Sequence, residues 1–164
     1  VYDKISTDIN IWVCGGNFDI IDENGKKVWE KKFPETDDEC RNAIWFRNPF
    51  AHNTVIFRKK CYEELGGYDD NLVYAEDLDL WVRYWQKYRF YNIQESLVQY
   101  RVFGWNSILK NQKLMIQNTL RIRKKAMKIG HSIWIKWVIF YIGAWCMQFL
   151  PPKFVLCLFN KINK

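Results

Sequence analysis

Strand and helix patterns mix along this short chain, and that mixture constrains its fold more than any other feature. The run from Ile11 to Ile21 is rich in β-branched and aromatic residues, and Asp22-Glu23-Asn24-Gly25 supplies turn chemistry directly after it. The stretch "INIWVCGGNFDIIDENGKKVWEKKF" therefore predicts two strands around a turn. "NTVIFRK" predicts a short strand, and "RFYNIQESLVQYRVF" predicts one or two more. Strands interspersed with helices predict an α/β or α+β domain.

The helices are marked by residues that start and stop them. "TDDE", Thr36 to Glu39, is a capping box, since the threonine can accept from a backbone N–H while the glutamate reaches back. We expect that helix to run to about Phe46 and to stop at Asn48-Pro49. "KKCYEELGG" predicts a short helix that ends on glycine, the residue that best accepts a left-handed conformation.

A third helix, from about Glu76 to Tyr88, begins with three carboxylates in "YAEDLDLWVR". Its apolar side chains recur at helical spacing and predict one buried stripe: Leu78, Trp81, Val82, Trp85 and Tyr88. The acids have an ordinary explanation, because a first helical turn favours negative charge and Asp79 can pair with Arg83 along the surface. Asp77 lies at the border of the buried stripe. A carboxylate held there on a rigid element suits a general base that takes a proton from a hydroxyl.

Charge divides the chain in two. All 18 acidic residues lie before position 100, together with 13 Lys and Arg, whereas residues 101–164 carry 12 Lys and Arg and no acid. A basic segment of this kind favours an anionic partner, either membrane phosphates or nucleic acid. The aromatic content of 18% argues against a disordered chain. Five scattered cysteines and two histidines give no zinc pattern, and reduced thiols in a cytosolic compartment are the simplest interpretation.

The basic segment predicts an amphipathic helix from Ile108 to Lys128, ended by Gly130. The apolar stretch after it, about Val138 to Leu150, is shorter than the roughly 20 residues that a spanning helix needs. Trp and Tyr near basic residues favour a helix that lies in the membrane interface. The alternative is a helical pair packed on the domain with its basic side in water; we favour the membrane surface.

The order of the motifs is similar to that of a known family. "GGYDDNLVYAEDLDLWVRYWQKYRFYNIQESLVQYRV" resembles the C-terminal half of the catalytic domain of family-2 glycosyltransferases. Members have a Gly-Gly-aromatic-Asp loop before a Glu-Asp pair, then a Leu-Trp-x-Arg helix and a strand that leads to Tyr-Arg. "VCGGNFDIIDENGK" and "NPFAHNTVIFRKKCYEELGGYD" resemble the segments upstream. The resemblance covers roughly residues 8 to 104.

This resemblance implies a partial GT-A domain, which is an α/β, Rossmann-like fold with a mixed sheet and here with C-terminal helices. It implies transfer of a sugar from a nucleotide-sugar donor to an acceptor hydroxyl, usually with inversion, in cell-surface polysaccharide or glycolipid synthesis. By motif position, Asp77 is the catalytic base and Glu76 its neighbour in the pair. The acceptor side is implied to comprise Gly66, Gly67, Tyr68, Asp69, His52, Trp81 and Arg83. As a loop residue His52 could contact acceptor or diphosphate, but a His in such a loop is more often an ordinary polar residue. The helical spacing of the aromatic residues in the acidic helix makes most of them core.

Two departures from the family pattern bear on the cofactor. The donor-binding half with its Asp-x-Asp metal motif is missing, and Phe103 stands where many members have a metal-binding His after Tyr-Arg. The divalent cation, Mg²⁺ or Mn²⁺, of the complete enzyme is therefore expected to have no ligands in this chain. We divide the chain into residues 1–104, the acceptor and base half, and residues 105–164, a tail that would hold the protein on the inner face of the cell membrane.

Two other functions remain open at this point. One is a basic module that binds membrane or nucleic acid without catalysis; the acidic first hundred residues oppose nucleic acid, and no nucleic-acid motif is present. The other is a noncatalytic remnant, because a chain without the donor half is expected to have no turnover by itself.

Overall fold

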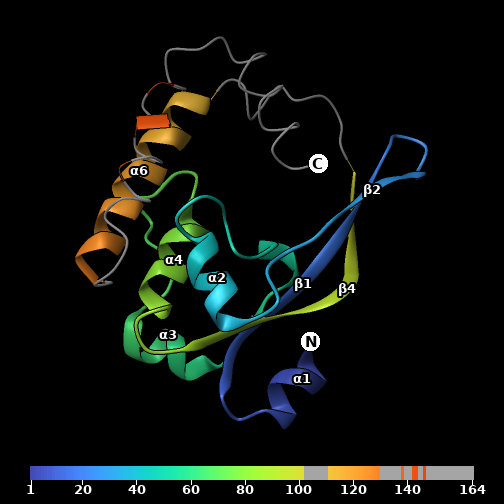
Figure 1. The fold of residues 1–164 in the computed structure, drawn as a ribbon, viewed down its shortest axis with the longest axis horizontal. Coiled ribbons are helices and arrows are strands. Elements are labelled where there is room, and N and C mark those ends of the chain that lie inside the picture. Colours follow the sequence, from blue (N-terminus) through green and yellow to red (C-terminus); the bar gives the residue numbers. More distant parts are fainter. Residues whose placement is uncertain (102–110, 130–137, 139–141, 144–145, 147–164) are drawn as a thin grey trace.

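The computed structural model describes residues 1–101, 111–129, 138, 142–143 and 146, and they form an α/β fold around a mixed sheet (Figure 1). Strand β1 (Ile11–Ile21) lies in the middle of the sheet. It runs antiparallel to β2 (Lys27–Lys31) and to β3 (Ile56–Phe57), and parallel to β4 (Arg89–Arg101). The predicted α/β class and mixed sheet are confirmed, and the open sheet is compatible with part of a Rossmann-like domain.

The helices α2, α3 and α4 lie on one side of the sheet, and α6 lies against α4 (Figure 1). The elements outside the sheet are α1 (Tyr2–Thr7), α2 (Asp37–Ala43), the 3₁₀ turn η1 (His52–Thr54), α3 (Lys59–Leu65), α4 (Glu76–Tyr84) and α6 (Gln112–Ile129). Successive side chains of β1 point to opposite faces of the sheet, as the alternation of side chains in a strand requires. Val13 belongs to the core under α4, whereas Cys14 packs with Ile5 of α1.

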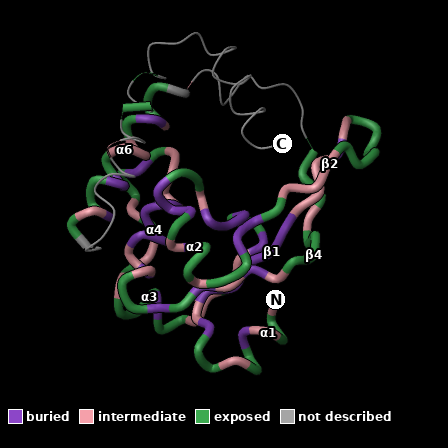
Figure 2. Tube along the Cα trace, in the orientation of Figure 1, coloured by how far each residue is buried: buried purple, intermediate pink, exposed green. Residues whose placement is uncertain are grey.

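The main core joins β1, α4 and α6, and Figure 2 shows buried residues on both β1 and α4. Its largest members are aromatic: Trp81, Tyr84, Tyr88, Phe50 and Phe90. The Phe50 ring meets the Trp81 and Phe90 rings edge-on at 5.1 and 5.2 Å between centroids, a geometry that aromatic quadrupoles favour.

Several local predictions are confirmed. The strand run and the turn after it are present, with Asp22 Oδ1 accepting from the backbone N–H groups of Asn24 and Lys26. The capping box is formed in both directions, because Thr36 accepts from the N–H of Glu39 and the Glu39 carboxylate accepts from the N–H of Thr36. The later strand region is one long strand, β4.

Two helix ends differ from the prediction. Helix α2 ends at Ala43 instead of Phe46, and α4 ends at Tyr84 instead of Tyr88. After α2, the N–H groups of Phe46 and Arg47 both donate to the backbone oxygen of Ala43, so the chain continues as a turn. After α4, the guanidinium of Arg41 donates to the backbone oxygens of Trp85 (2.8 Å) and Tyr88 (3.1 Å). These carbonyls are satisfied by a neighbouring side chain instead of by a further helical turn.

Helix α6 shares the core of the preceding domain. Ile122 and Ala126 are fully buried in the main cluster, and buried Arg123 donates through Nε to the backbone oxygen of Ile44 (2.8 Å). The predicted start of this helix at Ile108, its stop at Gly130 and almost all of the apolar stretch 138–150 lie outside the described residues. None of the helices in the described ranges has the length and hydropathy of a membrane-spanning segment.

Candidate active site

Asp77 lies in the first turn of α4 and is held at both carboxylate oxygens. Its Oδ1 accepts from the backbone N–H of Leu78 (2.7 Å), and its Oδ2 accepts from the side-chain amide of Asn48 (2.5 Å). The residue is half-buried. The carboxylate is therefore oriented by two donors from two segments, the helix itself and the loop after α2.

The surroundings of Asp77 favour proton uptake. Burial raises the pKa of its carboxyl above the ordinary value, against the opposing effects of the Leu78 N–H, the nearby His52 and the Asn48 amide, while Glu76 raises the pKa further. A buried carboxylate with a raised pKa accepts a proton more readily than a solvated one, which is what a general base requires.

The backbone just before Asp77 is strained. Tyr74 and Ala75 both have left-handed backbone conformations, with φ of 67° and 66°. Side chains other than glycine seldom adopt this region, and such strain is often found at functional sites. The strained pair turns the chain directly into the first residues of α4, so it determines where Glu76 and Asp77 project.

His52 and Tyr68 lie together near the carboxylate of Asp77. Tyr68 Oη is 3.4 Å from His52 Nε2, and their rings are 5.6 Å apart. Burial raises the pKa of Tyr68, and the negative charges of Asp77 and Glu76 raise it further, which places these four side chains in one electrostatic environment. The exposed side chains of His52 and Tyr68 thus adjoin the half-buried carboxylate of Asp77.

Close contact between two strands positions the loop that carries Asn48 and His52. Asn92 of β4 donates to the backbone oxygens of Pro34 (2.7 Å) and Pro49 (3.0 Å). A Cβ on Gly15 of β1 would lie only 2.6 Å from Asn92 Oδ1. Glycine at position 15 therefore allows Asn92 to hold this loop against the sheet.

The Gly66-Gly67 loop is held by the side chain of Arg83. Its guanidinium donates to the backbone oxygens of Leu65 (2.6 Å), Gly66 (3.0 Å) and Gly67 (2.5 Å), and Tyr84 Oη also donates to Gly66 (3.1 Å). The loop starts at Gly66, whose φ of 78° ends α3 as predicted. Arg83 thus fixes the segment that leads to Tyr68.

The predicted pair of Asp79 and Arg83 is present, but its predicted place on the surface is wrong. Asp79 is only 1% exposed, and its two oxygens contact Arg83 Nε (2.9 Å) and Lys125 Nζ (3.0 Å). The carboxylate is buried because α6 packs over this side of α4. Asp79 links α4, α6 and, through Arg83, the glycine loop.

The predicted site residues fall into two groups. The structure brings His52, Tyr68, Glu76 and Asp77 together. The others lie behind them or beside them: Trp81 is fully buried with its ring 6.2 Å from that of His52, and Asp69 Oδ1 closes a turn by accepting from the N–H of Asn71 (3.0 Å). These contacts give Trp81 and Asp69 supporting positions.

Sequence reasoning missed Asn48 and Asn118. The sequence predicts only a helix stop at Asn48, and it places Asn118 in a segment predicted to lie on a membrane surface. Asn118 donates to the backbone oxygens of Val73 (2.7 Å) and Tyr74 (3.4 Å), directly beside the strained turn. Each contact spans many residues of sequence, and no local signal marks it.

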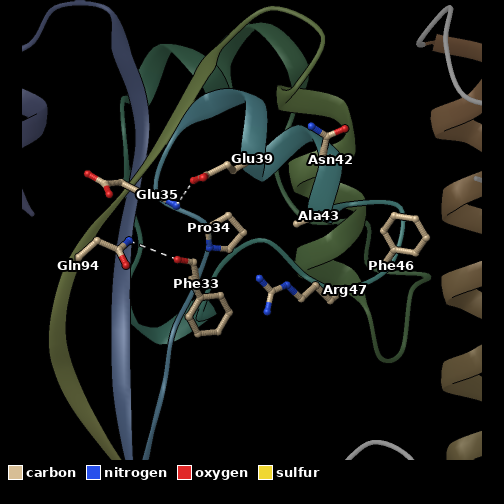
Figure 3. A pocket seen from close by; sticks show the side chains of 9 residues that line it. All are labelled: Phe33, Pro34, Glu35, Glu39, Asn42, Ala43, Phe46, Arg47 and Gln94. Atoms are coloured by element: carbon tan, nitrogen blue, oxygen red, sulfur yellow. Dashed lines mark hydrogen bonds between the residues drawn. The ribbon is translucent and has the colours of Figure 1, made fainter. Parts of the chain in front are cut away.

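A pocket of about 560 Å³ lies beside α2 and the loop that follows this helix (Figure 3). It is lined by side chains of mixed chemistry: Phe33, Pro34, Glu35, Glu39, Asn42, Ala43, Phe46, Arg47 and Gln94. None of the predicted site residues lines it. The pocket is nevertheless adjacent along the chain to the Asp77 site, because Arg47 lines the pocket and the next residue, Asn48, contacts Asp77.

Two other kinds of chemistry find no support in the described part of the chain. Within residues 1–101 and 111–129 and the four isolated positions, no group of three or more His, Cys, Asp or Glu side chains is placed to bind a metal ion. Burial raises the pKa of the Cys40 and Cys61 thiols to about 12, so these cysteines are not nucleophiles near neutral pH.

Comparison with known proteins gives three similar glycosyltransferases. An O-antigen biosynthesis glycosyltransferase of Escherichia coli is 33% identical over 93 residues, which cover 55% of this chain and 36% of that protein. The amylovoran biosynthesis glycosyltransferase AmsE of Erwinia amylovora is 24% identical over 152 residues, or 87% of this chain and 53% of the relative. An uncharacterized glycosyltransferase of Methanocaldococcus jannaschii is 30% identical over 144 residues, or 83% and 49%.

No protein-family model matches the chain. The chain spans about half, or less, of the length of the curated relatives it matches. All three relatives are named glycosyltransferases, which supports a glycosyltransferase role, and two of them are named for polysaccharide biosynthesis.

Proposed function

We propose that this chain is the acceptor- and base-bearing part of a family-2, GT-A-type glycosyltransferase. The reaction moves a sugar from a nucleotide-sugar donor to an acceptor hydroxyl with inversion, in the synthesis of a cell-surface polysaccharide or glycolipid. The observation that carries this proposal is the half-buried carboxylate of Asp77, oriented by Asn48 and the Leu78 N–H beside His52 and Tyr68.

The proposed chemistry is a single displacement. The acceptor oxygen attacks the anomeric carbon of the donor sugar, the bond from that carbon to the diphosphate oxygen breaks, and the hydroxyl proton passes to Asp77. The nucleoside diphosphate leaves with the electron pair of the broken bond. A general base of this kind contributes about 10²- to 10⁴-fold to the rate.

The cation and the donor are proposed to bind outside this chain. In the complete enzyme, Mg²⁺ or Mn²⁺ would neutralise the diphosphate. The described residues offer no metal-binding cluster, so they do not fit such a role and no step is assigned to the cation here. The tasks of this chain are to bind and orient the acceptor and to take its proton.

The pocket of Figure 3 is proposed to hold the part of a saccharide acceptor remote from the reacting hydroxyl. Phe46 offers a half-exposed ring for stacking, and Arg47 and Asn42 offer donors for sugar hydroxyls. An acceptor at Asp77 would reach the pocket across the loop of residues 46–48.

A lipid-linked acceptor on the inner face of the cell membrane fits the charge of α6. The outward side chains of this helix include four exposed cations: Lys113, Arg121, Lys124 and Lys128. Each cation near an anionic surface adds about 1 kcal/mol to binding. Cosedimentation with phosphatidylglycerol vesicles, lost at high salt, is expected; equal binding to neutral phosphatidylcholine vesicles would contradict the proposal.

The decisive experiment compares Asp77→Asn with Glu63→Gln in the complete enzyme that carries this sequence. Glu63 is an exposed acid of α3 whose surface pair with Lys59 lies away from the site, so its variant is the matched control. Release of nucleoside diphosphate from UDP- and GDP-sugars is measured with a membrane extract as acceptor. We expect Asp77→Asn to lose about 10²-fold or more of the rate and the control to lose none. Full transfer by Asp77→Asn would exclude the base role; no transfer by any form would favour a noncatalytic remnant.

A further inference from the structure

Helix α6 reaches the back of the candidate site at two points. Asn118 Nδ2 donates to the backbone oxygens of Val73 (2.7 Å) and Tyr74 (3.4 Å), and Lys125 Nζ lies 3.0 Å from Asp79 Oδ1. Both contacts cross from the basic segment to the polypeptide around Asp77. Neither is needed to bury the apolar side of α6, which Ile122 and Ala126 already do.

The Asn118 contact acts on strained backbone. Tyr74 and Ala75 are the non-glycine residues with left-handed φ in the described ranges, and strain of this kind persists only where the surroundings fix it. The two carbonyls that Asn118 binds come immediately before and within this pair. One amide thus holds the turn that directs the chain into Glu76 and Asp77.

The Lys125 contact is part of a network of ion pairs centred on Asp79. Asp79 is buried and accepts from Lys125 at one oxygen and from Arg83 at the other. Arg83 in turn donates to three carbonyls of the loop that precedes Tyr68. A change at Lys125 therefore alters the charge balance of Asp79 and, through Arg83, the support of this loop.

We propose that Asn118 and Lys125 are positioning residues: Asn118 sets the turn that aims Asp77, and Lys125 lets Asp79 and Arg83 hold the loop of Tyr68. The catalytic meaning of this arrangement rests on the proposed function, because it assumes that Asp77 is the base. The arrangement itself is a property of the folded chain and is measurable without turnover. Helix α6 is then part of the site, although its sequence predicts a helix that lies on a membrane surface.

The Asn118 part is tested by NMR titration of the Asp77 side-chain carboxyl carbon. Besides Asn48 and the Leu78 N–H, the groups that influence this carboxyl are His52, Glu76 and Tyr68. In Asn118→Ala the turn is free to relax and Asp77 to become hydrated, so we expect its pKa to fall toward 3.8, the ordinary value. Gln117→Ala, an exposed neighbour on α6, should leave the pKa unchanged.

A merely structural role for Asn118 predicts a different result. Asn118→Ala would then lower the unfolding temperature while the pKa of Asp77 stayed at its wild-type value, and that outcome would overturn the proposal. If the alanine variant does not fold, Asn118→Ser is measured instead, since serine keeps a donor that is too short to reach both carbonyls. For Asn118→Ser too, a lowered pKa of Asp77 would support the proposal, and an unchanged pKa with a lowered unfolding temperature would overturn it.

The Lys125 part is tested by amide hydrogen exchange across residues 66–68. We expect Lys125→Met to speed exchange there by about tenfold or more, and Lys124→Met, an exposed lysine beside it, to have no effect. Equal exchange in both variants would overturn this part.

In the complete enzyme, Asn118→Ala should lower kcat with little change in the KM for the donor. Absence of transfer in the unmodified enzyme would refute the proposed function and leave the NMR and exchange results to stand by themselves.

Discussion

Arg83→Met is expected to destabilise the fold strongly, because this side chain pairs with a buried carboxylate. The guanidinium of Arg83 makes two kinds of contact at once. It pairs with the buried carboxylate of Asp79 at 2.9 Å, and it donates to the carbonyls that end α3 and form the glycine loop. Methionine keeps much of the length of the side chain but provides neither the charge nor the donors.

The size of the loss follows from burial. Removing one partner of a buried ion pair costs roughly 3–5 kcal/mol. Asp79 keeps Lys125 on its other oxygen, so the lower end, about 3 kcal/mol, applies. The loop carbonyls are near water and lose about 1 kcal/mol together. A total of about 4 kcal/mol lowers the unfolding temperature of a chain of this size by roughly 8–16 °C.

Urea and thermal unfolding followed by tryptophan fluorescence measure this loss. Lys59→Met is the matched control, because Lys59 forms an i,i+4 pair with Glu63 at 3.0 Å on the surface, with the lysine 87% exposed. We expect that control to change the free energy of unfolding by less than about 0.5 kcal/mol. A loss below about 1 kcal/mol in Arg83→Met would refute the reasoning, since Asp79 would then have the energetics of a solvated carboxylate.

Four further changes test other parts of the molecule. Thr36→Ala should lower the free energy of unfolding by about 1 kcal/mol by removing the capping box, measured by urea denaturation. Gly66→Ala should cost about 1–3 kcal/mol in the same assay, because φ of 78° strains any residue with a Cβ. The unfolding temperature of Asp77→Asn relative to that of the wild type should rise as the pH increases from below about 3.8 to 7, because burial raises the pKa of Asp77 and its ionised form then destabilises the folded wild-type chain. Arg47→Ala should raise the KM for a saccharide acceptor roughly tenfold without changing the KM for the donor.

Local chemistry made much of the fold predictable. The strand run that became β1, the capping box at Thr36 and the glycine end of α3 each depend on residues that are neighbours in sequence. The end of α4 was predicted too late, because the carbonyls that follow this helix accept from Arg41, which lies 44 and 47 residues away in sequence. Short-range patterns carry no information about such partners.

The site was predictable only as far as its motifs extend. Asp77, Tyr68 and His52 follow from the resemblance, and the structure brings them together. Asn48 and Asn118 contact the site from 29 and about 44 residues away, and a single asparagine in a loop or on a helix has no pattern of its own. Their roles arise from the packing of the loop after α2 and of α6 against α4.

Asp77 and Asp79 lie in the same turn of α4 but have opposite environments. This difference indicates which of the two carboxylates is suited to act as a general base. Asp79 is buried between Arg83 and Lys125, and its ion pairs with these two cations hold it in place. Asp77 is half-buried, and it accepts hydrogen bonds from two neutral donors, an amide and a backbone N–H, with burial raising its pKa. A carboxylate fixed by two cations supports structure, whereas one fixed by neutral donors can gain and lose a proton without breaking an ion pair. The same turn of α4 therefore separates a structural acid from a candidate base, and α6 contributes to both by binding Asp79 and by holding the backbone that leads to Asp77.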